Sequence, residues 1–258
     1  MTAQPSLDCR ELRFGGPPAW KYDITDENHH RRVNHQSVLV SDETDHRLIV
    51  MGGRRFVGPN TLNNRWYRDD KSVQFLTLSS QRQEEPPIWT SLPDMNEARL
   101  SFSSWCFGNK LYVMGGLSAG NFVHTLEILD LDNIDAGWTL NPLPFILNTL
   151  NPWHCNAVAV STHCIFAAFS VDGGKIVYCS YDAQTDEWNL NLNEGSDQRR
   201  CAISMASITV PGEGSYVVTL DGSRQSAEAY HVESDAWYAI GRAAFHSDRV
   251  SCCGNVRY

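Results

Sequence analysis

The sequence predicts an all-β protein, a β-propeller whose blades are four-stranded antiparallel sheets. Tryptophans recur at positions 89, 138, 188 and 237, at intervals of 49, 50 and 49 residues. Short apolar segments of strand type precede each of them, with almost no helical periodicity. The segment HRLIVMGG at 46–53 is nearly repeated as NKLYVMGG at 109–116. A repeat of about 50 residues indicates stacked units, because four strands alone cannot bury both faces of their sheet.

Each unit is expected to contain four strands, a to d, in chain order. In the clearest unit, residues 96–143, SFSSWCFGNKLYVMGG supplies strands a and b, with a turn at Gly108–Asn109. HTLEILDL then forms strand c, and Trp138 lies in strand d. The other c strands are SVQFLTL, KIVYCSYD and SAEAYHVE.

Two kinds of repeated residue are expected to be structural. The glycines that end strand b permit a sharp exit of the chain and close approach of a neighbouring backbone; these are Gly52, Gly53, Gly115 and Gly116. The tryptophans recur once in each blade, which suits packing between neighbouring blades better than ligand binding; these are Trp20, Trp89, Trp138, Trp188 and Trp237.

The whole chain, residues 1–258, is predicted to be one propeller domain. Four whole blades are expected at about 33–93, 94–145, 150–193 and 197–242. Near the amino end, Trp20 follows Arg13 by seven residues, as Trp188 follows Tyr181, so this segment is interpreted as strands c and d. At the carboxyl end, CCGNVRY is similar to CFGNKLY of strands a and b. We therefore expect a fifth blade closed by both termini, from residues 7–24 and 246–258.

The pattern of Gly-Gly after strand b, a Tyr-like residue in strand c and Trp in strand d resembles the kelch repeat. This resemblance covers nearly the whole chain and is clearest at residues 96–143. It implies a kelch-like β-propeller, although six or seven blades are more usual than five. In kelch domains that bind peptides, arginines surround the mouth of the channel. Arg99, in EARLSFSS, matches that position, and the resemblance implies the same use for it.

Composition and charge narrow the possible partners. Apolar residues make up 42% and charged residues 20% of the sequence, as in ordinary globular domains. The formal charge of -9 argues against nucleic acid as the main partner. We expect no membrane insertion, because no export signal or long apolar segment is found. The eight cysteines show no C-x-x-C or zinc spacing, so free thiols in the cytoplasm, with no metal site and no cofactor, are predicted.

One face of the propeller is expected to bind a partner. Chain direction reverses at every turn, so the d-to-a and b-to-c connections emerge on the same side. Each blade start on that side carries a cationic or titratable residue: Arg32, Arg99, His154, Arg200 and Arg249. A long insertion at 54–72 adds Arg65, Trp66, Tyr67 and Arg68. These arginines would pair with carboxylates or phosphorylated segments. The alternatives are that the arginines bond strand-end carbonyls inside the propeller and that Trp66 packs on its own blade.

The predicted function is a non-catalytic protein-protein interaction module, an adaptor or scaffold that binds another protein or an acidic peptide on this face. One alternative is a structural subunit of a large assembly. Another is a kelch-type enzyme acting on an anionic sugar, in which the same arginines would hold a carboxylate inside a deep cleft. Catalysis is not expected, since the chain has neither a phosphate-binding glycine loop nor a G-x-S-x-G segment.

Overall fold

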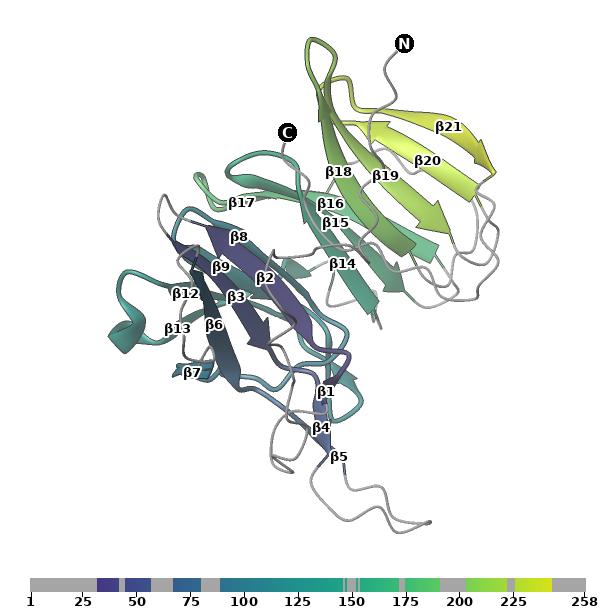
Figure 1. Cartoon of the computed structure of the whole chain (residues 1–258). Coiled ribbons are helices and arrows are strands. Elements are labelled where there is room, and N and C mark those ends of the chain that lie inside the picture. Colours follow the sequence, from purple (N-terminus) through teal and green to yellow (C-terminus); the bar gives the residue numbers. More distant parts are fainter. Residues whose placement is uncertain are drawn as a thin grey trace, which may run out of the picture. The chain divides into compact units, whose positions relative to one another are not determined.

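The computed structural model of the chain is shown in Figure 1, and its strands are labelled there. The described residues are 32–41, 45–56, 67–79, 89–145, 147, 152, 154–171, 175–190, 203–221 and 226–242. The chain divides into two compact units, residues 1–31 and 32–258, and every described element belongs to the second. The predicted split blade of residues 7–24 and 246–258 lies outside the described residues.

The described part is all-β, as predicted, and contains four antiparallel sheets of four strands each. Blade 1 has the order β2-β3-β6-β7, with bounds Gln36–Ser41, Asp45–Met51, Val73–Ser79 and Trp89–Leu92. Blade 2 has the order β8-β9-β12-β13, with bounds Ser103–Phe107, Lys110–Met114, Thr125–Asp130 and Trp138–Pro142. A single turn of 3₁₀ helix, η1 (Ile134–Ala136), joins β12 to β13.

Blades 3 and 4 repeat this arrangement. Blade 3 has the order β14-β15-β16-β17, with bounds His154–Ala159, Cys164–Val171, Lys175–Asp182 and Glu187–Asn189. Blade 4 has the order β18-β19-β20-β21, with bounds Ile203–Val210, Gly214–Asp221, Ser226–His231 and Ala236–Arg242. The a strands of successive blades, β2, β8, β14 and β18, contact one another in that order, as the inner strands of a propeller do. Among the described residues, no helix has the length and hydropathy of a membrane span.

Two small sheets are built from the connections outside the blades. The first has the order β1-β4-β5, with bounds Arg32–Val33, Arg54–Phe56 and Tyr67–Asp69. Its strands β4 and β5 belong to the long b-to-c connection of blade 1, and β1 precedes strand a of the same blade. The second small sheet is the hairpin of β10 (Leu117–Ser118) and β11 (Asn121–Phe122), in the b-to-c connection of blade 2.

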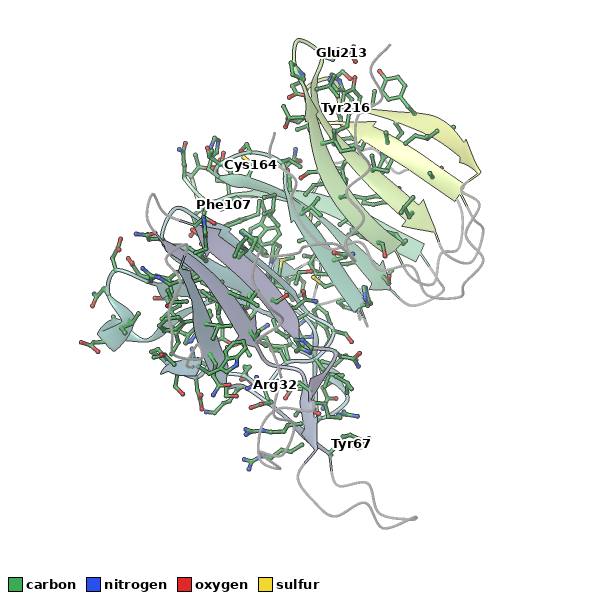
Figure 2. The ribbon with its side chains drawn as sticks, viewed as in Figure 1. Arg32, Tyr67, Phe107, Cys164, Glu213 and Tyr216 are labelled. Carbon is green, nitrogen blue, oxygen red and sulfur yellow. The ribbon has the colours of Figure 1, made fainter. Side chains whose placement is uncertain are left out.

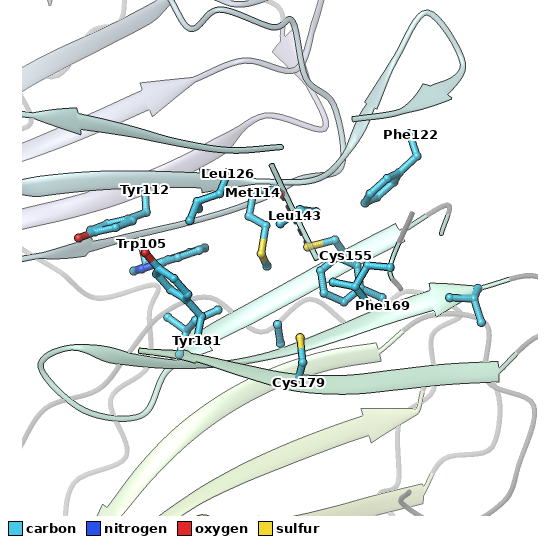
Figure 3. Packing of buried hydrophobic residues seen from close by; sticks show 14 of the residues in the cluster. Trp105, Tyr112, Met114, Phe122, Leu126, Leu143, Cys155, Phe169, Cys179 and Tyr181 are labelled. Carbon is cyan, nitrogen blue, oxygen red and sulfur yellow. Dashed lines mark hydrogen bonds between the residues drawn. The ribbon is translucent and has the colours of Figure 1, made fainter. Parts of the chain in front are cut away.

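The hydrophobic cores lie between neighbouring blades. Between blades 2 and 3, Trp105 stacks on Tyr112 with ring centroids 5.5 Å apart, and the cluster continues through Phe169 and Tyr181 (Figure 3). In blade 2, Trp138 packs in the core shared with blade 1, and its Nε1 donates to the Pro93 carbonyl oxygen of the preceding connection at 2.8 Å. Trp188 and Trp237 likewise pack toward the blade before their own. Trp138, Trp188 and Trp237 thus each help to join two blades.

The glycine pairs after strand b lie where no side chain fits. Gly53 and Gly116 have φ values of +86° and +85°, in the left-handed region that disfavours residues with a Cβ. A Cβ on Gly116 would lie 2.8 Å from the Leu100 carbonyl oxygen, and one on Gly53 would lie 2.7 Å from the Val33 carbonyl oxygen. The pairs therefore allow the segment before strand a to cross strand b closely.

Candidate partner-binding surface

Arg99 is buried inside blade 2, so the expectation that it contacts a partner is wrong. Its side chain is 0% exposed, and all five N–H groups of its guanidinium have acceptors within the blade. Nε donates to Glu127 Oε1 at 3.2 Å, and one Nη donates to the carbonyl oxygens of Gly115 and Thr125 at 2.7 and 3.0 Å. The other Nη donates to the Thr125 hydroxyl and to Glu127 Oε1. No donor is left for a ligand.

Glu127 completes this buried arrangement and fastens the d-to-a connection to the blade. Its side chain is also fully buried, 2.8 Å from Arg99. Its carboxylate accepts the backbone N–H groups of Asn96 and Glu97 at 2.6 and 3.1 Å. Burial lowers the pKa of Arg99 from its ordinary value, and the Glu127 carboxylate opposes that shift. We call Arg99 with its acceptors the arginine clamp of blade 2, and it is the structural alternative that the sequence left open.

Arg32 forms the corresponding clamp in blade 1, with its side chain only 3% exposed. One Nη donates to the carbonyl oxygens of Gly52 and Ser72 at 3.3 and 3.1 Å. The other donates to the Ser72 hydroxyl at 2.8 Å and to Gln74 Oε1 at 3.4 Å. Strand pairing makes these positions equivalent to Gly115, Thr125 and Glu127 of blade 2. The prediction that Arg32 contacts a partner is therefore also wrong, because its guanidinium is buried in the blade.

The two clamps differ in where the carboxylate comes from. In blade 1 the position of Glu127 is taken by the neutral Gln74, and the negative charge is supplied by Asp70, 3.4 Å from Arg32. Asp70 also accepts from Arg55 Nη2 at 3.3 Å, from the Ser72 backbone N–H and from the Ser72 hydroxyl. One buried carboxylate therefore serves two guanidinium groups.

The sheet β1-β4-β5 carries a row of three arginines on one face. Arg32 pairs with Arg55, and Arg55 pairs with Arg68, across its antiparallel strands. Residues directly opposite one another lie on the same face of a sheet. Arg55 is 39% exposed and Arg68 is exposed, while Arg32 at the inner end is buried. We call these three residues the arginine row.

The other face of this small sheet is neutralised and tied to the next blade. Arg54 Nε donates to Asp69 Oδ1 at 2.8 Å, and these two are cross-strand partners. Asp69 Oδ2 accepts the backbone N–H of Ala119, in the turn of the β10–β11 hairpin, at 2.8 Å. The arginine row therefore stands on a sheet anchored on both sides, which limits the entropy lost when a ligand binds.

The charge of the small sheet is opposite to that of the chain. The sheet and the adjacent Asp70 together carry four arginines and two carboxylates, a formal charge of +2 on a chain of net charge -9. The arginines are Arg32, Arg54, Arg55 and Arg68, and the carboxylates are Asp69 and Asp70. Within the described part of the chain, no carboxylate lies within ion-pair distance of Arg68. Exposed guanidinium groups on a fixed strand favour bidentate pairing with carboxylates or phosphate groups.

The remaining predicted contact residues fall into two groups. Tyr67 lies on β5 and is 42% exposed, next to Arg68 (Figure 2). His154 begins strand a of blade 3 and is half-buried; burial lowers its pKa from the ordinary value, which favours the neutral imidazole over the expected cation. The others lie outside the described residues; these are Arg65, Trp66, Arg200 and Arg249.

Arg68 was expected among the contact residues of the insertion, whereas Arg54 and Arg55, in the same insertion, were not predicted as surface residues. The signal that could have found them is alternation. Arg55 and Arg68 fall on one face only if the two ends of the insertion pair as strands, and that register depends on the fold.

Comparison with known proteins agrees with this architecture. Residues 98–133 match the model of the Kelch motif, a span that contains Arg99, the glycine pair and strand c of blade 2. No curated protein matches the chain. A kelch motif in general indicates a protein-interaction module, and domains built from it typically bind without catalysis. This motif and the four-stranded antiparallel sheets together support a kelch-like β-propeller architecture.

Proposed function

We propose that the protein is a non-catalytic interaction module that binds an acidic segment of a partner protein on the sheet β1-β4-β5. The observation that carries the proposal is the arginine row. Its one buried carboxylate, Asp70, pairs with Arg32 and Arg55, and no carboxylate of the described residues lies within ion-pair distance of Arg68. Tyr67 adds an exposed aromatic ring beside the row, and Tyr and Arg are the residue types that dominate protein interfaces. The sheet lies on the side of the d-to-a and b-to-c connections, where the sequence predicted binding.

Arg68 is the expected centre of recognition. It is the exposed end of the row, and the positive charge of Arg55 beside it is already partly balanced by Asp70. An acidic side chain placed between Arg55 and Arg68 would relieve the repulsion of two like charges that are directly opposite on neighbouring strands. Each charged contact of this type is worth about 1.5–3 kcal/mol when well aligned.

An enzyme that holds an anionic sugar has less support. That alternative needed Arg99 and its counterparts to line a deep cleft, but the donors of Arg99 are fully used inside the blade. A cleft of about 300 Å³ at the edge of blade 3 and one of about 190 Å³ between blades 3 and 4 are lined by carboxylates such as Asp182 and Asp235 and by no arginine of the described residues. Such clefts repel an anionic substrate.

The test is binding of a fluorescein-labelled glutamate-rich peptide, followed by fluorescence anisotropy at several salt concentrations. Arg68→Glu is expected to weaken binding at least tenfold, because it removes an attraction and adds a repulsion. The matched control is Lys110→Glu, an equal charge change at the exposed first residue of β9, directly after the a-to-b turn of blade 2. Equal affinity of the Arg68→Glu variant and the wild type, or equal loss in both variants, would contradict the proposed surface.

A further inference from the structure

A second group of chemically active side chains lies at the other end of the strands, in blade 3. Cys164 begins β15, and Asp182 ends β16 as its cross-strand partner. His163 precedes Cys164 directly. One ligand atom of each residue, a ring nitrogen, the sulfur and a carboxylate oxygen, lies within 4.8 Å of the other two. Figure 2 shows Cys164 away from the labelled residues Arg32 and Tyr67 of the arginine row's sheet.

The second ring nitrogen of His163 and the second carboxylate oxygen of Asp182 have hydrogen-bond partners outside this group. His163 Nδ1 lies 3.2 Å from the Thr162 hydroxyl, which leaves Nε2 facing Asp182 Oδ2 at 3.9 Å. Asp182 Oδ1 accepts the backbone N–H groups of Gln184 and Thr185 at 2.8 and 3.4 Å, and the Asp182 carboxylate also accepts a hydrogen bond from the Cys164 thiol. In metal sites, hydrogen bonds to the second nitrogen of a histidine and the second oxygen of a carboxylate orient the ligands in this way.

The backbone of the two adjacent residues is also fixed. The Ser161 hydroxyl accepts the backbone N–H of His163 at 3.2 Å and that of Cys164 at 3.0 Å. This turn therefore presents the imidazole and the thiol together. The distance of 3.9 Å between His163 Nε2 and Asp182 Oδ2 is longer than a hydrogen bond.

The group opens into a cleft with room for a further ligand. The cleft of about 300 Å³ is lined by Cys164, Asp182, Thr185, Glu187 and Trp188, among others. Glu187 is the cross-strand partner of Asp182, so Cys164, Asp182 and Glu187 form a row on one face of the blade. Two carboxylates near one thiol and one imidazole give a site that attracts a cation.

The donor set selects the kind of cation. Calcium and magnesium prefer oxygen ligands alone, whereas zinc accepts thiolate, imidazole and carboxylate together in a tetrahedral arrangement. We propose that His163, Cys164 and Asp182 bind one zinc ion, with Glu187 or a water molecule in the fourth position. On binding, the S–H bond of Cys164 breaks, a zinc–sulfur bond forms, and the proton passes to solvent.

No metal site was predicted from the sequence, because it contains no C-x-x-C and no His or Cys pair at zinc spacing. The proposed ligands are instead a His–Cys dipeptide at the start of one strand and an aspartate at the end of the next, brought together by register. The same register places Lys110 opposite Asp130 in blade 2, which is an ordinary pair of opposite charges. Blade 3 replaces that lysine with Cys164.

The experiment measures zinc bound per chain after equilibrium dialysis, for the wild type and for Cys164→Ser, Asp182→Asn and Cys106→Ser. We expect one zinc per wild-type chain and at least tenfold weaker binding in the first two variants. Cys106→Ser is the matched control, since Cys106 is another half-buried free thiol, outside the group. Asp182→Asn keeps an oxygen that can accept from Gln184 and Thr185, so the turn should survive, and circular dichroism checks the fold of each variant.

Cobalt substitution gives a second readout that does not depend on stability. A cobalt-substituted wild-type chain is expected to show thiolate-to-cobalt charge-transfer absorption that Cys164→Ser removes and Cys106→Ser retains. The proposal is overturned if the wild type binds no zinc, if Cys164→Ser binds it as tightly as the wild type, or if the cobalt absorption persists without Cys164, which would assign the metal to another cysteine.

Discussion

The arginine clamps of blades 1 and 2 use the same position in the repeat, but the carboxylate that balances the arginine comes from a different residue in each blade. Both arginines lie four residues before strand a and donate to the same four acceptor positions. In blade 2 the fourth acceptor is the carboxylate of Glu127, and the clamp is neutral and buried. In blade 1 it is the amide of Gln74, so Asp70 provides the charge and shares it with Arg55.

This difference connects the interior of blade 1 with the exposed sheet. Asp70 follows directly after β5, so the carboxylate that neutralises Arg32 is part of the insertion that carries the arginine row. The insertion is thereby fastened to blade 1 by an ion pair, and its outer arginines keep their positive charge. Where blade 1 has the neutral Gln74 in place of Glu127, the charge that pairs with the buried arginine comes from the insertion and couples it to the blade.

Blade 3 has no carboxylate at the position that Glu127 occupies in blade 2. Glu127 lies two residues before the partner of Trp138, and the same position before the partner of Trp188 is Cys179, which is 0% exposed. An apolar residue therefore fills the site in blade 3.

The largest expected effect is that of breaking the neutral clamp. Arg99→Met should lower the free energy of unfolding by about 3–5 kcal/mol, because it leaves the Glu127 carboxylate buried without its cation. Urea denaturation measures the change. The double variant Arg99→Met with Glu127→Met should recover a large part of the loss. A single variant within about 1 kcal/mol of the wild type would show that the pair is not a stabilising element.

The glycines whose carbonyl oxygens accept hydrogen bonds from the clamp arginines should show the opposite order. For them, the larger loss of stability is expected in blade 1. Gly52 and Gly115 have similar φ values, +59° and +64°, so alanine is strained by about 1–2 kcal/mol at either position. A Cβ on Gly52 would also lie 2.8 Å from the Arg99 carbonyl oxygen, whereas one on Gly115 meets only side chains, at 3.0 Å or more. We expect Gly52→Ala to cost about 2–4 kcal/mol and Gly115→Ala to cost less. Thermal unfolding of the two variants decides this, and an equal cost would contradict the role of the close backbone.

The smallest effect is expected from the clamp of blade 1. Arg32→Met should cost about 1–3 kcal/mol, less than Arg99→Met, because Asp70 retains Arg55 and the Ser72 hydroxyl as partners. The measurement is again urea denaturation, with Arg55→Met as the companion variant. If Arg32→Met proves as costly as Arg99→Met, the sharing of Asp70 does not protect blade 1.

Periodicity was sufficient to predict the architecture of the blades. A Trp near every fiftieth residue, a glycine pair after strand b and alternating apolar residues depend only on local chain geometry and on the need to bury one face of each sheet. The all-β class, the four-stranded sheets and the kelch likeness could therefore be predicted from the residues alone. The face that carries the d-to-a and b-to-c connections follows from chain reversal in the same way.

Only the tertiary structure decided what each arginine does. Arg32 and Arg99 were expected on a binding surface, and both are buried, because an arginine four residues before strand a reaches acceptors that strands b and c supply from as far as 42 residues away. The arginine row and the His163–Cys164–Asp182 group depend in turn on strand register. Sequence alone determined the repeated scaffold, since local patterns specify it, whereas burial and the pairing of charges depend on contacts between distant segments and were decided by the fold.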